Sequence, residues 1–505
     1  NGNDPEAVRS AASFAYEYRN KFSCDVIIDM ISYRKYGHNE ADEPSYTQPL
    51  LYKKIKKIQP VRKIYQEELV KEKILSTQDA EQMVKDYINM LNDHFSKRRR
   101  SDTKTDFSKN YKPGQIFEDF KTQVNEDIII KVAETVSDYP SNFNVHPKLG
   151  ALVQKRIDRV KEGKIDWALA EALSFGTILL NGKEIRFSGQ DVRRGTFSQR
   201  HAVLTDILTE DNYISLNHID EENQGVIRIF DSPLSEIAVL GFEYGYSLIA
   251  SNSLTLWEAQ FGDFANGAQP IFDQFISCGE SKWGKTSNLV VLLPHSYDGQ
   301  GPEHSSGRLE RYLQLCANEN MIVCNLTTPA QYFHILRRQV LMPFKKPLVI
   351  MTPKSMLRNT QAISNIKDLS QGRFYHLIDD TSVNKKKTKK IILSTGKVYY
   401  ELLDQRKKSS KEDVALVRVE QIYPFNIQKL KAILSEYPKV EDIIWVQEEP
   451  KNMGAWPYLQ QQFYENLDDI RVRYVGRTES PATATGLMSI HLKEQQKIML
   501  EAIEG

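Results

Sequence analysis

The sequence has few cysteines and no long apolar run, and both shortages exclude classes of protein. The four cysteines among 505 residues show neither the paired spacing of a zinc site nor the density of a disulfide-rich secreted domain, and they suit a reducing compartment. They are Cys24, Cys278, Cys316 and Cys324. Because Cys24, Cys316 and Cys324 lie among apolar residues, we expect these three to be buried. The longest apolar runs, such as Leu289–Leu293, are far too short to span a membrane.

An excess of charge of one sign is also missing. The chain has 67 Lys and Arg against 66 Asp and Glu, which gives a net charge of +1. This balance provides no electrostatic footprint for nucleic acid or for an anionic membrane surface. We therefore expect neither a nucleic acid nor a membrane as a partner.

Several common catalytic and targeting motifs are absent as well. The sequence contains no HExxH, no GxSxG and no GxGxxG after a predicted strand. No targeting segment is recognisable, but the chain begins at Asn1 rather than at Met, so we expect it to be a piece of a longer protein. Its length corresponds to about three domains.

The first region is predicted to contain a helix, a strand and a charged loop. Asp4 is a good helix cap before Pro5 and Glu6, and Val26–Ile31 is an apolar run that predicts a buried strand. The loop Tyr33–Pro44 follows it. Because ligands in open α/β sheets bind beyond the carboxyl ends of strands, His38 in this loop is a candidate site residue. The alternative is that His38 is an ordinary surface histidine.

A polar helical region and a basic segment come next. Lys53–Phe95 is predicted to be helical, whereas Ser96–Gly114 has no apolar periodicity. This second stretch includes the basic run Lys97–Arg100. We interpret it as a solvated linker or insertion, with a docking patch as the alternative.

A second unit begins near Asp166, and three of its predicted strands lead directly into polar loops. The strands are Glu184–Phe187, Leu254–Glu258 and Leu289–Leu293. Three such strand-to-loop transitions predict one parallel sheet with a single functional rim. Between the first two strands we expect a helix from Ser235 to Leu248, in which Gly241 and Gly245 would permit close packing.

Each candidate site residue of this unit can also be explained by a structural role that requires no ligand. Glu236 is a first-turn carboxylate, which the helix dipole favours in any protein. His295 and His304 flank a glycine-rich loop and are either ligands for a substrate carboxylate or members of a turn network. Phe261 and Phe264 are core residues or rings on which a cofactor stacks.

A third unit follows the lysine-rich segment 384–390. It alternates predicted strands with helical stretches, which indicates another α/β domain. Its predicted strands are Ile391–Leu393, Val414–Val417, Ile443–Val446 and Val472–Val475.

Eight segments along the chain resemble the thiamine-diphosphate-dependent 2-oxo acid dehydrogenases, in particular the members that act on 2-oxoglutarate. They lie in the same order as in that family and cover nearly the whole chain. The segments are Tyr33–Leu50, Ser188–Asp191, Arg194–His201, Leu256–Phe264, Gly301–Ser306, Thr352–Ser355, Ser394–Tyr400 and Val446–Pro450.

The resemblance implies an α/β, multi-domain, transketolase-like fold that binds thiamine diphosphate, with parallel sheets flanked by helices. It divides the chain into the tail of a diphosphate-binding domain (1–95), a linker and helical insertion (96–165), a pyrimidine-binding domain (166–357) and a carboxyl-terminal α/β domain (358–505).

The resemblance also implies roles for the candidate residues. Glu236 would hydrogen-bond a ring nitrogen of the cofactor aminopyrimidine, which activates the cofactor. Gln190 and Gln260 would contact the cofactor, and Phe264 would stack near its pyrimidine. His38 and His304 would lie near the diphosphate, the substrate or the reaction intermediate. The implied catalytic residues are therefore Glu236, His304 and His38.

One departure from the family concerns the metal. The family's magnesium and diphosphate motif begins Gly-Asp-Gly or Gly-Asp-Ala and would lie upstream of Asn1. We therefore expect magnesium as a cofactor but assign no metal ligand within these residues, and we expect this chain alone to be inactive.

The resemblance implies a small 2-oxo acid as substrate and a homodimer as the assembly. It further implies the lipoyl-bearing dihydrolipoamide succinyltransferase and dihydrolipoamide dehydrogenase as partners in a complex of the tricarboxylic acid cycle. The expected location is the cytoplasm in a bacterium or the mitochondrial matrix in a eukaryote. Two alternatives remain, a 2-oxoadipate dehydrogenase of the same family and a non-catalytic piece that docks on the acyltransferase core.

Overall fold

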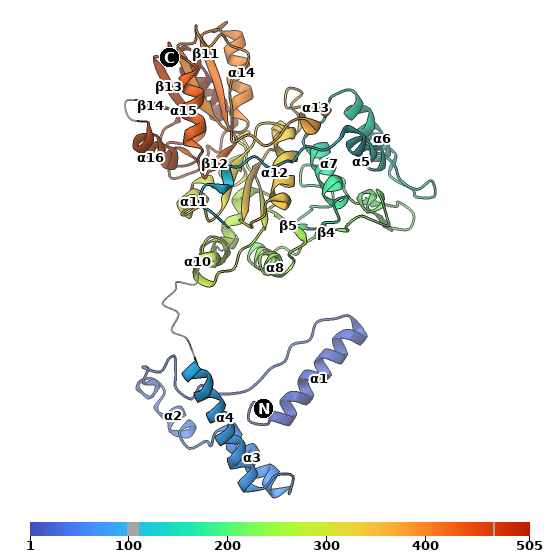
Figure 1. The fold of residues 1–505 in the computed structure, drawn as a ribbon, viewed down its shortest axis with the longest axis vertical. Coiled ribbons are helices and arrows are strands. Elements are labelled where there is room, and N and C mark those ends of the chain that lie inside the picture. The colour runs from blue at the N-terminus through green and yellow to red at the C-terminus, as the bar shows by residue number, and fades with distance from the viewer. Residues whose placement is uncertain (98–110, 468–469) are drawn as a thin grey trace. The chain divides into compact units, whose positions relative to one another are not determined.

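The computed structural model describes residues 1–97, 111–467 and 470–505. It divides into two compact units, residues 1–104 and residues 105–505 (Figure 1). The basic residues 98–100, which the sequence suggested as a linker or docking patch, lie outside the described residues.

Unit 1 is helical. Asp4 caps the first helix as predicted, since its side chain accepts a hydrogen bond of 2.9 Å from Ala7 N. The predicted polar helical region is confirmed and consists of three helices. The elements of unit 1 are α1 (Pro5–Phe22), η1 (Pro44–Tyr46), α2 (Pro49–Ile55), α3 (Val61–Lys71) and α4 (Thr77–Lys97).

The predicted buried strand Val26–Ile31 is wrong. Residues 23–34 form no helix or strand, and Ile27 and Ile31 are 93% and 74% exposed. A strand needs a neighbouring strand for its N–H and C=O groups, and the described residues of unit 1 contain none. Cys24, which we expected to be buried, is exposed in the same segment.

The larger sheet of unit 2 has the strand order β12-β7-β8-β6-β5-β1-β4. All neighbours run parallel except β12, which is antiparallel to β7. The predicted strands at 184–187, 254–258 and 289–293 are confirmed as β1, β5 and β6. The strand bounds are β1 (Glu184–Gly189), β4 (Ile227–Asp231), β5 (Ser253–Glu258), β6 (Val290–Pro294), β7 (Ile322–Asn325), β8 (Leu348–Thr352) and β12 (Gln421–Tyr423).

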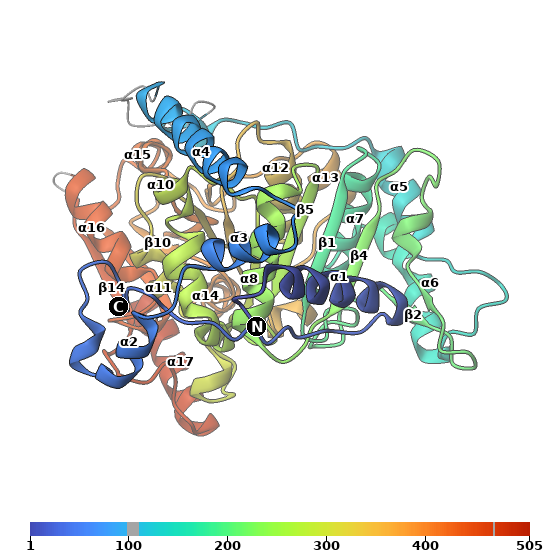
Figure 2. The same cartoon turned by 90° about the horizontal axis from the view of Figure 1, so that it is seen from below.

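Helices cover both faces of this sheet, because alternate residues of each strand point to opposite sides. In β6, Val290 and Leu292 join the core on the side of α7 and α12, whereas Val291 and Leu293 join the core on the side of α8. Figure 2 shows α7 beside β1, β4 and β5. The covering helices are α7 (Trp167–Leu179), α12 (Pro329–Leu341), α8 (Glu236–Ile249) and α11 (Leu309–Gln314).

The described part of the predicted linker and insertion packs into the same core. It contains η2 (Gln115–Phe117), α5 (Glu126–Thr135) and α6 (Pro147–Lys161). Ile129 and Val132 of α5 are fully buried beside Leu173 of α7. Helices α5 and α6 therefore belong to the layers of unit 2.

The smaller sheet has the order β14-β13-β10-β11-β9 and confirms the four strands predicted for the third unit. Glu420 alone separates β11 from β12, so the chain passes directly from the smaller sheet into the larger one. The elements are β9 (Leu377–Ile378), β10 (Lys390–Ser394), β11 (Val414–Val419), β13 (Asp442–Pro450), β14 (Val472–Arg477), α14 (Val398–Lys408), α15 (Ile427–Ser435), α16 (Trp456–Asn466) and α17 (Met488–Glu504).

Short elements connect these layers. They are β2 (Leu204–Thr205), β3 (Asn212–Tyr213), η3 (Ser215–His218), η4 (Gly262–Ala268), α9 (Gln269–Ile271), a π-helical turn η5 (Phe272–Ile276), α10 (Gly279–Trp283), η6 (Pro302–His304), η7 (Ser355–Arg358) and α13 (Ile366–Ser370).

Candidate active site

The polar loops predicted to share a rim do lie at one edge of the larger sheet. Strands β8, β6, β5 and β1 are parallel neighbours in that order, with Gly189 paired to Glu258 and Pro294 paired to Thr352 at their carboxyl ends. The residues that follow these ends are Gln190, Gln260, the loop 295–304 and Lys354. The rim is therefore formed by four successive strands.

At one part of the rim, Gln190 and Glu236 form a hydrogen-bonded pair. The side-chain Nε2 of Gln190 donates to Oε1 of Glu236 over 3.1 Å. Glu236 is the first residue of α8 and is half-buried, so its carboxylate lies at the positive end of that helix. The structure thus brings together two residues that the sequence predicted to act at one site.

The short helix η4 connects this pair to the aromatic residues of the rim. A side-chain carbon at Gly267 of η4 would come within 3.3 Å of Glu236 Oε2, so the glycine keeps space open beside that oxygen. Phe264, also in η4, has its ring 5.5 Å from the His304 ring. The Phe261 ring lies 4.6 Å from His304. Glu236, Phe264 and His304 therefore line one continuous stretch of the rim.

The two histidines of the 295–304 loop have different surroundings. His295 is buried, its Nδ1 accepts a hydrogen bond of 2.9 Å from Gly307 N, and its Nε2 lies 3.1 Å from Glu449 of β13. Both of its ring nitrogens thus have partners within the fold. His304 is half-buried against the two phenylalanines. The geometry favours a structural role for His295 and leaves His304 as the candidate that faces a ligand.

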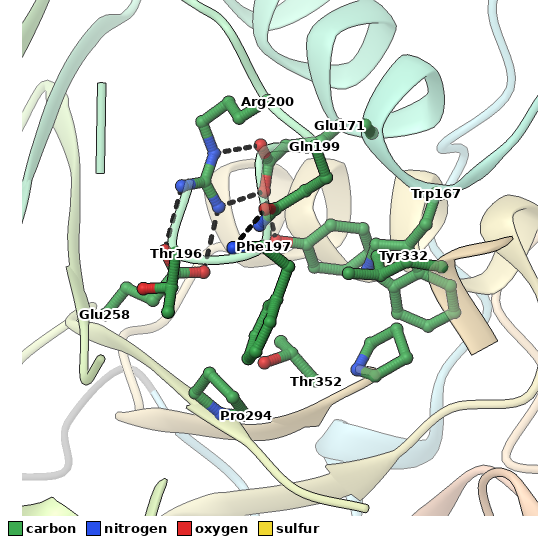
Figure 3. A pocket seen from close by; sticks show the side chains of 13 residues that line it. Trp167, Glu171, Thr196, Phe197, Gln199, Arg200, Glu258, Pro294, Tyr332 and Thr352 are labelled. Atoms are coloured by element: carbon green, nitrogen blue, oxygen red, sulfur yellow. Dashed lines mark hydrogen bonds and ion pairs between the residues drawn. The ribbon is translucent and has the colours of Figure 1, made fainter. Parts of the chain in front are cut away.

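A small cavity lies at the rim, and a buried charge cluster forms part of its wall. Figure 3 shows the guanidinium group of Arg200 between the carboxylates of Glu171 and Glu258. Arg200 donates to both Glu258 oxygens over 2.8 Å and to Val192 O over 3.1 Å. Glu258 is two residues before Gln260, and Val192 is two residues after Gln190. Arg200 therefore joins the strand ends that carry both glutamines.

Burial governs the ionisation of this cluster. Desolvation raises the pKa of Glu258, with Arg200 acting in the opposite direction. Desolvation by itself would lower the pKa of Arg200, but Glu171 and Glu258 outweigh it and raise that pKa well above the ordinary value. The guanidinium group is thus held charged inside the protein. Tyr332 completes the cluster by donating a hydrogen bond of 2.7 Å to Glu171.

His38 belongs to unit 1. It is exposed, and its backbone N–H donates to Asp42 Oδ2 over 2.9 Å. Because the two units are described separately, the structure does not bring His38 together with the rim, and its predicted role stays a prediction.

The sequence reasoning missed one motif and two residues. Gly279–Thr286 matches the phosphate-loop pattern GxxxxGK[ST], but residues 279–283 form helix α10, and no strand leads directly into the motif as that loop requires.

Arg200 and Lys354 carried no pattern of their own that predicted burial. The only signal was their place inside the segments Arg194–His201 and Thr352–Ser355.

Within the described residues, no group of three or more His, Cys, Asp or Glu side chains is arranged to hold a metal ion. No described helix is both long enough and apolar enough to cross a membrane.

Three families match the chain in succession. Residues 1–105 match "Dehydrogenase E1 component", residues 163–360 match "Transketolase, pyrimidine binding domain", and residues 363–503 match "2-oxoglutarate dehydrogenase C-terminal". The second match covers the larger sheet except β12, and the third covers the smaller sheet. The predicted transketolase-like α/β fold is thereby confirmed.

Individual relatives match over the whole chain. The 2-oxoglutarate dehydrogenase E1 component of Haemophilus influenzae is 44% identical over 100% of this chain and 54% of its own length. The proteins of the same name from a Geobacillus species and from Brucella anthropi are each 45% identical, over 99% and 100% of this chain and 53% and 52% of their own lengths. The chain thus spans about half the length of the curated relatives it matches. Over its whole length the chain is similar to part of the 2-oxoglutarate dehydrogenase E1 components of these bacteria.

Proposed function

We propose that the protein to which this chain belongs is a thiamine-diphosphate-dependent dehydrogenase that decarboxylates 2-oxoglutarate and transfers the succinyl group to a lipoyl group. The main supporting observation is the pair Gln190–Glu236 on the rim of a pyrimidine-binding domain. The names of the relatives favour 2-oxoglutarate over the 2-oxoadipate alternative.

The chemistry of the rim fits an aminopyrimidine. Such a ring is flat and carries both hydrogen-bond donors and acceptors, so it needs polar groups of both kinds and an aromatic wall. Glu236 offers a carboxylate acceptor beside the space kept by Gly267, and Gln190 and Gln260 offer amides. Phe264 supplies an aromatic face at the same rim.

When bound, thiamine diphosphate supplies the electron sink that allows a 2-oxo acid to lose carbon dioxide. The residues of this chain would position and tune it. Glu236 would hold a proton at the pyrimidine ring nitrogen, while the hydrogen bond from Gln190 fixes the direction of its carboxylate. Phe261 and Phe264 would exclude water, and His304 would donate a hydrogen bond to the 2-oxo acid.

Oxidation of 2-oxo acids by the full-length protein tests this proposal. Purified protein with thiamine diphosphate and magnesium should reduce ferricyanide when given 2-oxoglutarate. Its kcat/KM should be at least about tenfold lower for 2-oxoadipate, since one extra methylene costs about that much in a fitted pocket. A preference for 2-oxoadipate would contradict the substrate assignment. Turnover of neither acid, with retained binding to the succinyltransferase, would support the scaffold alternative.

We further propose a homodimer in which α8 packs against a second copy of the chain, as part of a complex with the succinyltransferase and dihydrolipoamide dehydrogenase. The outer face of α8 is apolar and exposed. Phe242 is 60% exposed and Ile249 is 84% exposed, with the exposed Gly245 between them and the exposed Ala238 one turn before Phe242. Apolar faces of this kind mark protein interfaces, and the small residues allow two helices to approach closely.

Replacing Phe242 by lysine should therefore weaken the dimer. Losing a central aromatic contact of an interface costs about 2 kcal/mol or more, so the dissociation constant should rise at least about 30-fold. Sedimentation velocity over a concentration series measures it. Tyr464→Lys is the matched control, because Tyr464 is 89% exposed on α16, away from α8. An unchanged dimer in Phe242→Lys would show that α8 is not the interface.

A further inference from the structure

Lys354 is a buried lysine whose polar partners lie in the loop that carries His304. It follows β8 at the rim, and only 3% of its side chain is exposed. Its ammonium group donates to the backbone oxygen of His304 and, over 2.8 Å, to Gln300 Oε1. Asp298 Oδ2 lies 3.7 Å away. One side chain thus holds the loop at three points.

The same ammonium group lies 5.7 Å from the centre of the Phe261 ring. Phe261 in turn has its ring 4.6 Å from the imidazole of His304. Lys354 therefore contacts both the backbone of His304 and the ring against which the imidazole packs.

The carboxylate near Lys354 is itself fixed in place. Asp298 Oδ1 accepts hydrogen bonds of 2.8 Å from Ser296 and 2.7 Å from Ser355. Burial opposes ionisation of Asp298, but Lys397, Ser355 and Lys354 outweigh it and keep its pKa below the ordinary value. A charged carboxylate therefore faces Lys354. A buried ammonium group is costly unless such partners surround it, so the lysine and the ordered loop stabilise each other.

We propose that Lys354 is the positioning residue for His304, in that it fixes the loop 298–304 so that the imidazole stays packed against Phe261 and Phe264 at the rim. The expected effect of Lys354 on catalysis rests on the proposed function. The structural part, that the loop contacts of Lys354 hold the imidazole in place, is independent of that function.

The structural part can be tested with this 505-residue chain. In Lys354→Met the loop loses its anchor, so carbethoxylation of His304 by diethyl pyrocarbonate, followed by mass spectrometry, should become about tenfold faster. The exposed His218 provides an internal reference in the same samples. Lys346→Met is the matched control, because Lys346 is also 3% exposed but pairs with Glu280, outside the rim. Lys354→Gln, which keeps a donor, should fall between wild type and Lys354→Met.

An unchanged rate at His304 in Lys354→Met would overturn the proposal. A parallel rise at His218 and His304 would also overturn it, because it would show general unfolding rather than release of one loop.

The catalytic part requires the full-length protein. Lys354→Met should lower kcat for 2-oxoglutarate about as much as His304→Ala does, and the double variant should be little worse than either single variant, since residues that act as a unit are not additive. If the fold-reductions in kcat of the two single variants multiply in the double variant, Lys354 does not act through His304. If the wild-type protein does not decarboxylate any 2-oxo acid, the proposed function fails, whereas the carbethoxylation result still decides whether Lys354 positions the imidazole.

Discussion

Replacing Glu236 by alanine in the full-length protein should lower kcat for 2-oxoglutarate by about 10²–10⁴-fold, the usual contribution of a group that transfers a proton. The carboxylate is half-buried, hydrogen-bonded to Gln190 and next to the space at Gly267, so no other group of the rim replaces it. Glu236→Gln should lose nearly as much, because an amide keeps the shape but cannot hold the proton. Ferricyanide reduction under saturating cofactor measures the effect.

The fold should tolerate these changes. A first-turn carboxylate stabilises a helix by about 0.3–1 kcal/mol, so the melting temperature should fall only slightly. Glu303→Ala is a suitable control, since Glu303 is an exposed carboxylate beside His304 on the same rim. Activity of Glu236→Ala within a few-fold of wild type would show that the catalytic glutamate is misassigned.

The strands of unit 2 were predictable because each is a local pattern. Apolar runs that end in polar loops predicted β1, β5 and β6 and their common rim, since the carboxyl ends of parallel strands must meet at one edge. A common site for Gln190 and Glu236 was implied only by the family resemblance, and the structure brings the two side chains together.

The failed strand Val26–Ile31 shows where local patterns stop being sufficient. An apolar run looks the same in the sequence whether or not another strand is available to pair with it. Whether such a partner strand exists depends on residues elsewhere in the chain. Likewise, a sequence does not distinguish a lysine in solvent from Lys354, whose acceptors are about 50 residues away in the chain. His295 was ambiguous for the same reason, because its partner Glu449 comes from the other sheet.

The largest loss of stability is expected from Arg200→Met. This change leaves Glu171 and Glu258 facing each other, buried and without a cation, and removing one partner of a buried ion pair costs about 3–5 kcal/mol. Urea unfolding followed by circular dichroism measures the difference. The exposed pair Arg373–Asp119 provides the control, because Arg373→Met should cost at most about 1 kcal/mol.

The pH dependence of this variant distinguishes uncompensated charge from lost packing. Without Arg200, burial and the nearby carboxylate of Glu171 raise the folded-state pKa of Glu258 above the unfolded value, with no cation to oppose them. A group whose pKa is raised by folding favours the folded state at low pH and loses that contribution as the pH rises through the folded-state pKa. The deficit of Arg200→Met relative to wild type should therefore be smaller at about pH 5 than at pH 8. The triple variant Glu171→Gln, Arg200→Met, Glu258→Gln removes both charges and should show no such difference. An equal deficit at both pH values would mean that Arg200 stabilises the rim through its packing rather than through its charge.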